Sequence, residues 1–192
     1  MKFSKIKLAK NGTLEATYKN NDGDLIQFIG ANIVHKDLRD ALQALIPHLA
    51  LITEQREAFK TTLNKLREQR ITDNEDNVYK RLSVSGVAFS ADGKKIIITG
   101  SRILSCVGVV SVCTPLINLE DDDVYEYINE LSLDIDAVVY EAQAYIEEKK
   151  WGVKQAEIKF DDIDPYKAEA GDVPEVEPAA PKKRGCKPKK VA

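Results

Sequence analysis

Two glycine turns, Asn11-Gly12 and Asp92-Gly93, constrain the fold more than any other feature of the sequence. Each turn lies between two runs in which apolar residues alternate with polar or charged ones. Such alternation is typical of half-buried strands, and Asn-Gly or Asp-Gly between two of them predicts a β-hairpin. We therefore expect hairpins over residues 3–19 and 79–104, the first with a type I′ turn at Asn11-Gly12.

A third strand follows each hairpin. The first is LIQFIG at residues 25–30, and the second is CVGVVSVCTPLI at residues 106–117, which Pro115 ends. The second run is β-branched and nearly uncharged, which predicts a central strand. Gly86 interrupts the alternation of its strand and predicts a β-bulge.

Helices are expected after each set of strands. Leu38, Leu42, Leu45 and Leu49 recur at helical spacing, and Pro47 should kink or restart that helix. Residues 54–70 favour helix with few apolar positions, which predicts a solvated helix or a projecting arm. Residues 119–152 form the longest helical pattern, with an acidic start and Lys149-Lys150 before a Gly152 C-cap. Its apolar stripe either packs on the sheet or forms a dimer seam, so a homo-oligomer is one expectation.

The resulting order is βββα(α)–βββα, which predicts an α+β fold in which an antiparallel sheet system is braced by two or three helices. We expect residues 1–160 to form one domain, or two similar halves over 1–70 and 78–152. Residues 161–192 should be a disordered tail, because the stretch after Phe160 is rich in Asp, Glu and Pro.

Charge is segregated along the chain although the net charge is −3. Residues 1–120 carry 17 basic and 13 acidic side chains, and residues 121–160 carry 4 and 11. Residues 161–180 carry 1 and 7, whereas residues 181–192 carry 6 basic side chains and no acidic one. A mildly basic body thus precedes an acidic helix, an acidic linker and a basic tip.

Several function classes are disfavoured. No run approaches the 18 or so apolar residues of a membrane span, and residues 1–12 lack the apolar core of a signal peptide. The three cysteines form no CxxC; Cys106 and Cys113 are expected to be buried thiols on opposite strand faces, and the compartment to be cytoplasmic. No P-loop, GxSxG or HExxH motif occurs, and the Asp121–Asp123 run fits a helix first turn. We therefore expect no enzyme, no metal and no cofactor.

Basic residues on or beside the predicted strands are the candidate nucleic-acid site. Single-strand binders combine a basic groove with aromatic stacking platforms, and Tyr18, Phe28, Tyr79 and Phe89 lie near these residues in the sequence. The same lysines also fit the solvated face of an ordinary antiparallel sheet. The candidates in the body are Lys5, Lys7, Lys10, Lys19, Tyr79, Lys80, Arg81, Lys94, Lys95 and Arg102.

The tail PKKRGCKPKK, residues 181–190, resembles a degenerate AT-hook. That motif lays an Arg-Gly-Arg-Pro core in an A·T-rich minor groove while flanking basic residues meet phosphates. Arg184 and Gly185 match the core, but Cys186-Lys187 replace the second arginine, which leaves general phosphate attraction. The tail either contacts nucleic acid or only solubilises the chain; its candidates are Lys182, Lys183, Arg184, Lys187, Lys189 and Lys190.

Two further resemblances bear on function. The order of elements resembles that of Whirly-type single-strand-binding proteins, by architecture and not by motif. The segments DLRDALQALIPHLALITEQREA, VYEYINELSLDIDAVVYEAQAYIEEKKWGVKQAEIKF and the basic tip resemble small proteins of tailed phages of gut bacteria. This resemblance implies a virus-encoded protein acting on nucleic acid in a bacterial cytoplasm. The leading expectation is non-catalytic single-stranded DNA binding in phage replication or recombination. The alternative is a virion or assembly component that docks a partner through its acidic helix.

Overall fold

The computed structural model describes residues 1–152 apart from 72–76, 107, 122 and 124. The described elements lie in a compact unit of residues 1–155. The predicted tail, with all six of its candidate residues, lies outside the described residues.

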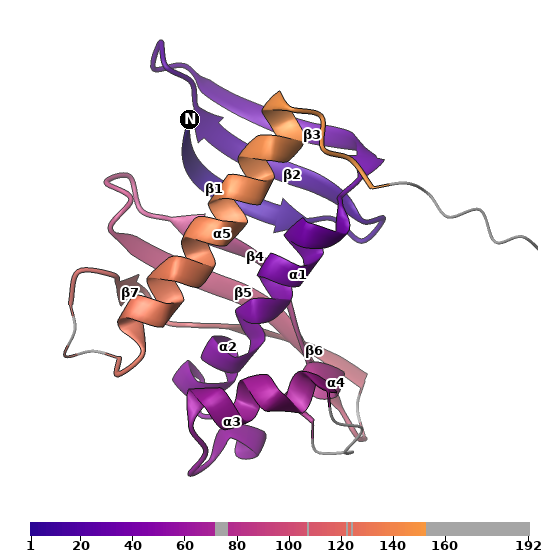
Figure 1. Ribbon diagram of the computed structural model, residues 1–192, viewed down its shortest axis with the longest axis vertical. Helices are drawn as coiled ribbons and strands as arrows, with labels where there is room; N and C mark the ends of the chain where they lie inside the picture. The colour runs from indigo at the N-terminus through magenta and orange to yellow at the C-terminus, as the bar shows by residue number, and fades with distance from the viewer. Residues whose placement is uncertain (72–76, 107, 122, 124, 153–192) are drawn as a thin grey trace, which may run out of the picture. The chain divides into compact units, whose positions relative to one another are not determined.

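One antiparallel sheet organises the protein, as the α+β prediction required (Figure 1). Its order is β3-β2-β1-β4-β5-β6, and the short β7 also pairs with β5. The strands are β1 (Lys2–Leu8), β2 (Thr13–Lys19), β3 (Leu25–Ile33), β4 (Leu82–Phe89), β5 (Lys95–Leu104), β6 (Gly108–Cys113) and β7 (Ile117–Asn118). The two predicted three-stranded groups therefore share one sheet, joined where β1 pairs with β4.

Both hairpins form, but the first turn differs from the prediction. A type I′ turn needs positive φ at both central residues, and at Asn11-Gly12 only Gly12 has it, at 78°. The loop is longer than two residues, because β1 ends at Leu8 and β2 begins at Thr13. The Asn11 side chain accepts a hydrogen bond from the Thr13 amide, 3.2 Å away, and this contact holds the loop without a second positive φ.

The helices cover one face of the sheet (Figure 1). The leucine stripe forms α1 (Lys36–Ala44) and α2 (Ile46–Ile52), and the helix restarts at Ile46 with Pro47 in its first turn, close to the predicted point. The longest helix is α5 (Ile128–Glu147), which lies beside α1. Its stripe packs into the same core instead of forming a dimer seam, since Leu131, Ile135 and Val138 are at most 2% exposed.

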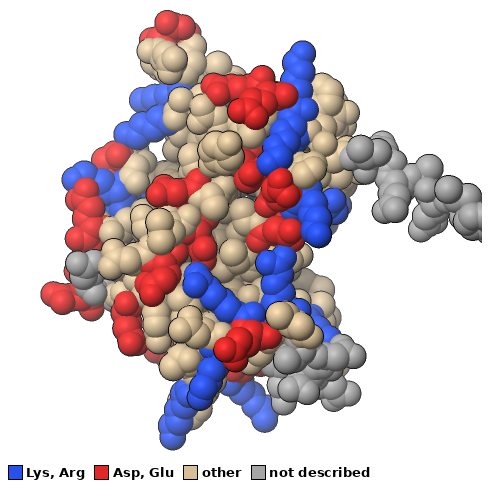
Figure 2. All heavy atoms as spheres, viewed as in Figure 1, with Lys and Arg blue, Asp and Glu red and all other residues tan. Residues whose placement is uncertain are grey.

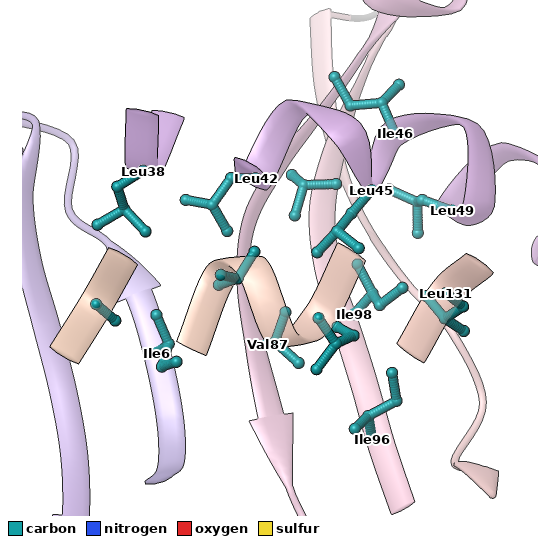
Figure 3. Packing of buried hydrophobic residues seen from close by; sticks show 14 of the residues in the cluster. Ile6, Leu38, Leu42, Leu45, Ile46, Leu49, Val87, Ile96, Ile98 and Leu131 are labelled. Carbon is teal, nitrogen blue, oxygen red and sulfur yellow. The ribbon is translucent and has the colours of Figure 1, made fainter. Parts of the chain in front are cut away.

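The core lies between this helical layer and the sheet. Leucines of α1 and α2 point toward isoleucines and valines of β1, β4 and β5 (Figure 3). Leu45, Leu49, Ile6 and Ile98 have no measurable solvent exposure. Since alternate strand residues point to opposite faces, this packing fixes which side chains remain on the uncovered face.

A buried polar network also ties the helices together. His48 of α2 has no exposed surface; its Nε2 lies 3.1 Å from Asp134 Oδ2 and its Nδ1 lies 2.9 Å from the Tyr125 hydroxyl. Because a carboxylate only accepts, Nε2 donates to Asp134, and in a neutral ring Nδ1 accepts from Tyr125. Arg67 donates to the same Asp134 oxygen at 2.8 Å. Burial raises the pKa of the Tyr125 phenol, so the hydroxyl keeps its proton.

Four predictions about individual elements are wrong. The uncharged strand is not central: β6 is an edge strand, because it pairs only with β5. Residues 54–70 are not a projecting arm; they fold back as η1 (Arg56–Ala58), α3 (Leu63–Glu68) and the start of η2 (Gln69–Ile71), with Leu63 and Leu66 buried. The longest helix begins at Ile128 and not in the acidic run, whose Asp121 caps a turn through the Asp123 amide. Cys106 and Cys113 are exposed, since one precedes β6 and the other ends this edge strand.

Within the described residues, no helix has the length and apolar character needed to cross a membrane.

Candidate nucleic-acid interface

The face of the sheet opposite the helices is called here the open face. Its strand residues alternate with buried core residues: Lys5 and Lys7 flank Ile6, and Thr99 follows Ile98. Helices cover the other face, and most side chains of the open face are exposed or half-buried.

Lysines dominate the charge of the open face. Lys2, Lys5 and Lys7 of β1, Lys19 of β2 and Lys95 of β5 all alternate with core positions. Glu15, by the same alternation, is the one acidic strand residue on this face, and its carboxylate lies 3.5 Å from Lys7 Nζ. Five ammonium groups against one carboxylate give the open face a net positive charge.

The register places these lysines close together. Lys2 is directly opposite Lys19, and Lys7 is directly opposite Glu15 in the antiparallel pair of β1 and β2. Residues directly opposite in such a pair have Cβ atoms about 5 Å apart. The Lys2 ammonium group donates a hydrogen bond to the Asp92 carbonyl oxygen at 3.0 Å, so the register brings the backbone positions of Lys2 and Lys19 together and not their charges.

A hollow of about 270 Å³ lies at the junction of β1 and β4 on this face. Its lining includes Lys5, Lys7, Ser85, Gly86 and Thr99. The two strands approach closely at Gly86, because this residue has no side chain; a Cβ there would lie 2.3 Å from the Ile6 carbonyl oxygen. The register shifts between Val84 and Gly86, as the predicted bulge required.

Small hydroxyl groups extend the polar surface across β4, β5 and β6. Ser83 is opposite Ser101, and Ser101 is opposite Ser111. The Ser83 and Ser101 hydroxyl oxygens are 2.8 Å apart. Hydroxyl groups can donate to phosphate oxygens, so this row continues the same kind of surface beyond the lysines.

The structure brings together only part of the predicted basic set. Lys5, Lys7, Lys19 and Lys95 lie on the open face, and Lys10 is exposed in the turn between β1 and β2. Lys94 instead pairs with Glu120 at 2.7 Å, and this hydrogen bond raises its pKa.

The remaining candidates lie in a short helix and in the adjoining part of β5. Tyr79, Lys80 and Arg81 belong to α4 (Val78–Arg81). The Tyr79 ring packs against the core, and burial raises the pKa of its hydroxyl. Arg102 of β5 is directly opposite Leu82 of β4 and points to the same, helix-covered face. The Arg102 side chain is 16% exposed.

The predicted aromatic platform is not on the open face. Phe28 contacts Tyr145 of α5 edge-on, with ring centroids 6.0 Å apart. Tyr18 is buried beside Phe3, and Phe89 packs against the core as Tyr79 does. The described strands therefore offer apolar aliphatic groups for base contact on the open face, among them Leu25 and Ile29, which are 65% and 71% exposed.

Sequence reasoning missed Lys2, although its alternation with Phe3 in the same strand as Lys5 was a sufficient signal. Within the described residues, no three His, Cys, Asp or Glu side chains are grouped so as to hold a metal ion.

The helix-covered face differs in character. Acidic and basic side chains are interspersed over it (Figure 2). Several of its cations are already paired, as where Lys150 meets both Asp37 and Glu141.

Comparisons with protein-family models, curated proteins and solved structures find no match.

Proposed function

We propose that the protein binds nucleic acid on the open face of its sheet, without catalysis, and that single-stranded DNA is the preferred ligand. The observation that carries this proposal is the excess of five lysines over one carboxylate on the strands of that face. Phosphate neutralisation by lysine supplies most of the affinity of sequence-independent nucleic-acid binding.

A broad sheet face favours a single strand over a duplex. Duplex grooves admit a helix or a two-stranded ribbon, whereas an unpaired strand can lie along a sheet with its bases against side chains. The hollow at Lys5 and Lys7 gives such a strand a recess at the centre of the sheet. The exposed Leu25 and Ile29 on β3 offer apolar contact to bases.

The setting we propose is replication or recombination of a phage in the cytoplasm of a bacterial host. It rests on the resemblance of the chain to tailed-phage proteins. The basic tip, as a phosphate-attracting accessory, would add to binding and would be restrained by the acidic linker before it.

The test is fluorescence anisotropy with a labelled single-stranded oligonucleotide. Lys5→Gln, Lys7→Gln and Lys19→Gln combined remove three charges from the open face. The control triple, Lys36→Gln, Lys60→Gln and Lys65→Gln, removes three exposed charges from the helical segments. Both triples should keep the melting temperature of the parent chain.

The slope of log affinity against log salt is negative, and each single-strand phosphate contact contributes about 0.7 to its magnitude. We expect the open-face triple to make the slope shallower by about 2. The control triple should leave that slope within about 0.5 of the parent value. An absence of binding by the parent at about 20 mM salt, or equal losses in the two triples, contradicts the proposal.

A rival function has one observation in its favour. Leu133 and Tyr140, seven residues apart on the outer side of α5, are 69% and 64% exposed. A contiguous apolar patch rimmed by polar side chains is typical of a protein contact; under this rival, Leu133 and Tyr140 form such a patch and α5 docks a partner in a virion or an assembly. Failure of the oligonucleotide test together with self-association abolished by Leu133→Ser would favour this rival.

A further inference from the structure

The outer edge of β6 has no strand partner within the part of the chain that the structure describes. β6 is the last strand of the sheet, and its ladder with β5 runs from Gly108 to Cys113 without a register shift. Val109 and Val110 are 68% and 38% exposed. Free backbone groups along an edge strand can pair with another chain, so such an edge is a candidate interaction surface.

Three residues of β6 turn their backbone groups away from β5. The amide of Thr114, directly after β6, donates to the Ile98 carbonyl at 3.0 Å. Residues of an antiparallel ladder alternate between bonding their neighbour and facing away from it, so the even-numbered residues of β6 bond β5. The carbonyl of Thr99, the register partner of Cys113, agrees with this alternation because it accepts from Ser85 of β4. The residues whose amide and carbonyl groups point outward are therefore Val109, Ser111 and Cys113.

β6 lacks the features that usually protect an edge strand. Its sequence, GVVSVC, has no charged residue and no proline, and its ladder has no bulge. Strands β1 and β2, inside the sheet, carry the lysines instead. At the opposite edge, the last residue of β3 is already bonded, since the Gly152 amide donates to the Ile33 carbonyl at 2.8 Å. A neutral β6 can lie beside a second β6 without a like-charge contact, which favours a second copy of this chain as the partner.

The outward groups are also symmetric about Ser111. Two β6 strands that run antiparallel about a two-fold axis place Ser111 opposite the partner's Ser111 and Val109 opposite the partner's Cys113. Outward residues then meet only outward residues, and each such pair exchanges two hydrogen bonds. Any other antiparallel register of the two strands forms fewer of these pairs. Between them, Val110 faces the partner's Val112, a β-branched contact of the kind that stabilises sheets.

We propose that two copies of this chain associate through β6, antiparallel and with Ser111 at the two-fold axis. The pairing occupies both β6 edges, so the contact is self-complementary and closes as a dimer. Because it continues the ladder, the two sheets join into one and the two open faces lie on the same side.

The dimer sets the distance between the two groups of lysines. From β1 to β6 there are three strand spacings in each copy, and the new pair adds one, so the two β1 strands lie about 34 Å apart along the sheet. A nucleic-acid strand that reaches both groups of lysines is a consequence that rests on the open-face proposal, whereas the dimer itself does not. The experiments on the dimer therefore contain no nucleic acid, and their failure is distinct from failure of the oligonucleotide test.

Sedimentation velocity of the full chain in reducing buffer tests the dimer. Ser111→Lys places a charge directly opposite the same charge in the partner. Ser83→Lys is the matched control, since Ser83 is exposed on the same face but lies on β4. We expect the parent and Ser83→Lys to dimerise in a series up to about 500 μM, and Ser111→Lys to raise the dissociation constant at least about tenfold. A parent that stays monomeric at about 500 μM, or equal losses in the two variants, overturns the proposal.

A charge exchange tests the register. Ser111→Glu alone should also weaken association, because it places two carboxylates opposite each other. An equimolar mixture of Ser111→Lys and Ser111→Glu brings opposite charges together and should associate at least about tenfold more tightly than either variant alone. A mixture no tighter than the separate variants overturns the pairing of Ser111 with itself. Association that Leu133→Ser abolishes and Ser111→Lys leaves intact assigns the contact to α5 and overturns it as well.

Disulfide cross-linking gives an independent measurement. On a background with Cys106→Ser and Cys186→Ser, Val109→Cys lies opposite the partner's Cys113 with Cα atoms about 5.5 Å apart, a distance that a disulfide spans. Val110→Cys is the control, because its side chain points to the other face of the sheet. Mild oxidation should link Val109→Cys into a covalent dimer and should link Val110→Cys at least about tenfold less. Equal cross-linking of the two variants, or none in Val109→Cys, contradicts the proposed register.

Discussion

Gly86→Ala tests the junction on which both the sheet and the open face depend. Strands β1 and β4 pair through Lys5, Ile6 and Lys7 alone, and Gly86 is the direct partner of Lys7. A Cβ at Gly86 would lie 2.3 Å from the Ile6 carbonyl oxygen and 2.9 Å from Lys7 Cα. Both atoms belong to the backbone, so no side-chain rotation can relieve the clash.

The expected cost follows from two opposed terms. Overpacking costs about 1–3 kcal/mol, and this contact lies at the upper end because a strand must move. Alanine restricts the unfolded chain more than glycine does and returns about 0.4–1 kcal/mol. The net loss in the free energy of unfolding is about 2 kcal/mol, which lowers the melting temperature of a domain of this size by about 4–8 °C.

Thermal unfolding followed by circular dichroism measures this loss. Ser85→Ala is the control, since it alters the neighbouring residue and removes only a partly exposed hydrogen bond to the Thr99 carbonyl. Its melting temperature should fall by about 2 °C or less. If Gly86→Ala melts within about 2 °C of the parent protein, the close approach at the β1–β4 junction is not as described.

Two further predictions concern the helical layer. Tyr125→Phe leaves His48 Nδ1 buried without its donor, and urea unfolding should show a loss of about 1–2 kcal/mol; an unchanged midpoint would exclude the buried hydrogen bond. Lys150 donates to Asp37 and lowers the pKa of that carboxyl below its ordinary 3.8. The stabilisation is therefore present above pH 3.8 and is lost as the pH falls through the lowered pKa. Lys150→Met should melt below the parent at about pH 7 and should match it at about pH 2; a constant difference between the two would contradict this linkage.

The hairpins and helical stripes could be predicted because their signals are local. Alternation around Gly12 and Gly93 and the leucine spacing of α1 are properties of short windows, and the structure keeps them. The face of the sheet on which Arg102 lies could also be predicted from the sequence. Ile96, Ile98, Gly100 and Arg102 are two residues apart, so a strand that buries the first two carries Arg102 to the same face.

Other features depended on non-local pairing and could not be read from the sequence. A run such as β6 suits a central or an edge position equally, and the strand order decides between them. The acidic run Asp121–Asp123 has the composition of a helix first turn. It lies instead in the connection between β7, which ends at Asn118, and α5, which begins at Ile128. The hydrogen bond between Arg102 and Glu57 joins residues 45 positions apart in the chain, and no short sequence window contains both.

The basic residues on the two faces of the sheet differ in their exposure and in their partners. On the open face the cations are lysines in water, which can exchange counterions for phosphates at little desolvation cost. On the covered face Arg102 is 16% exposed and already satisfied by Glu57 and Gln55, so a passing strand cannot recruit it without breaking a buried pair.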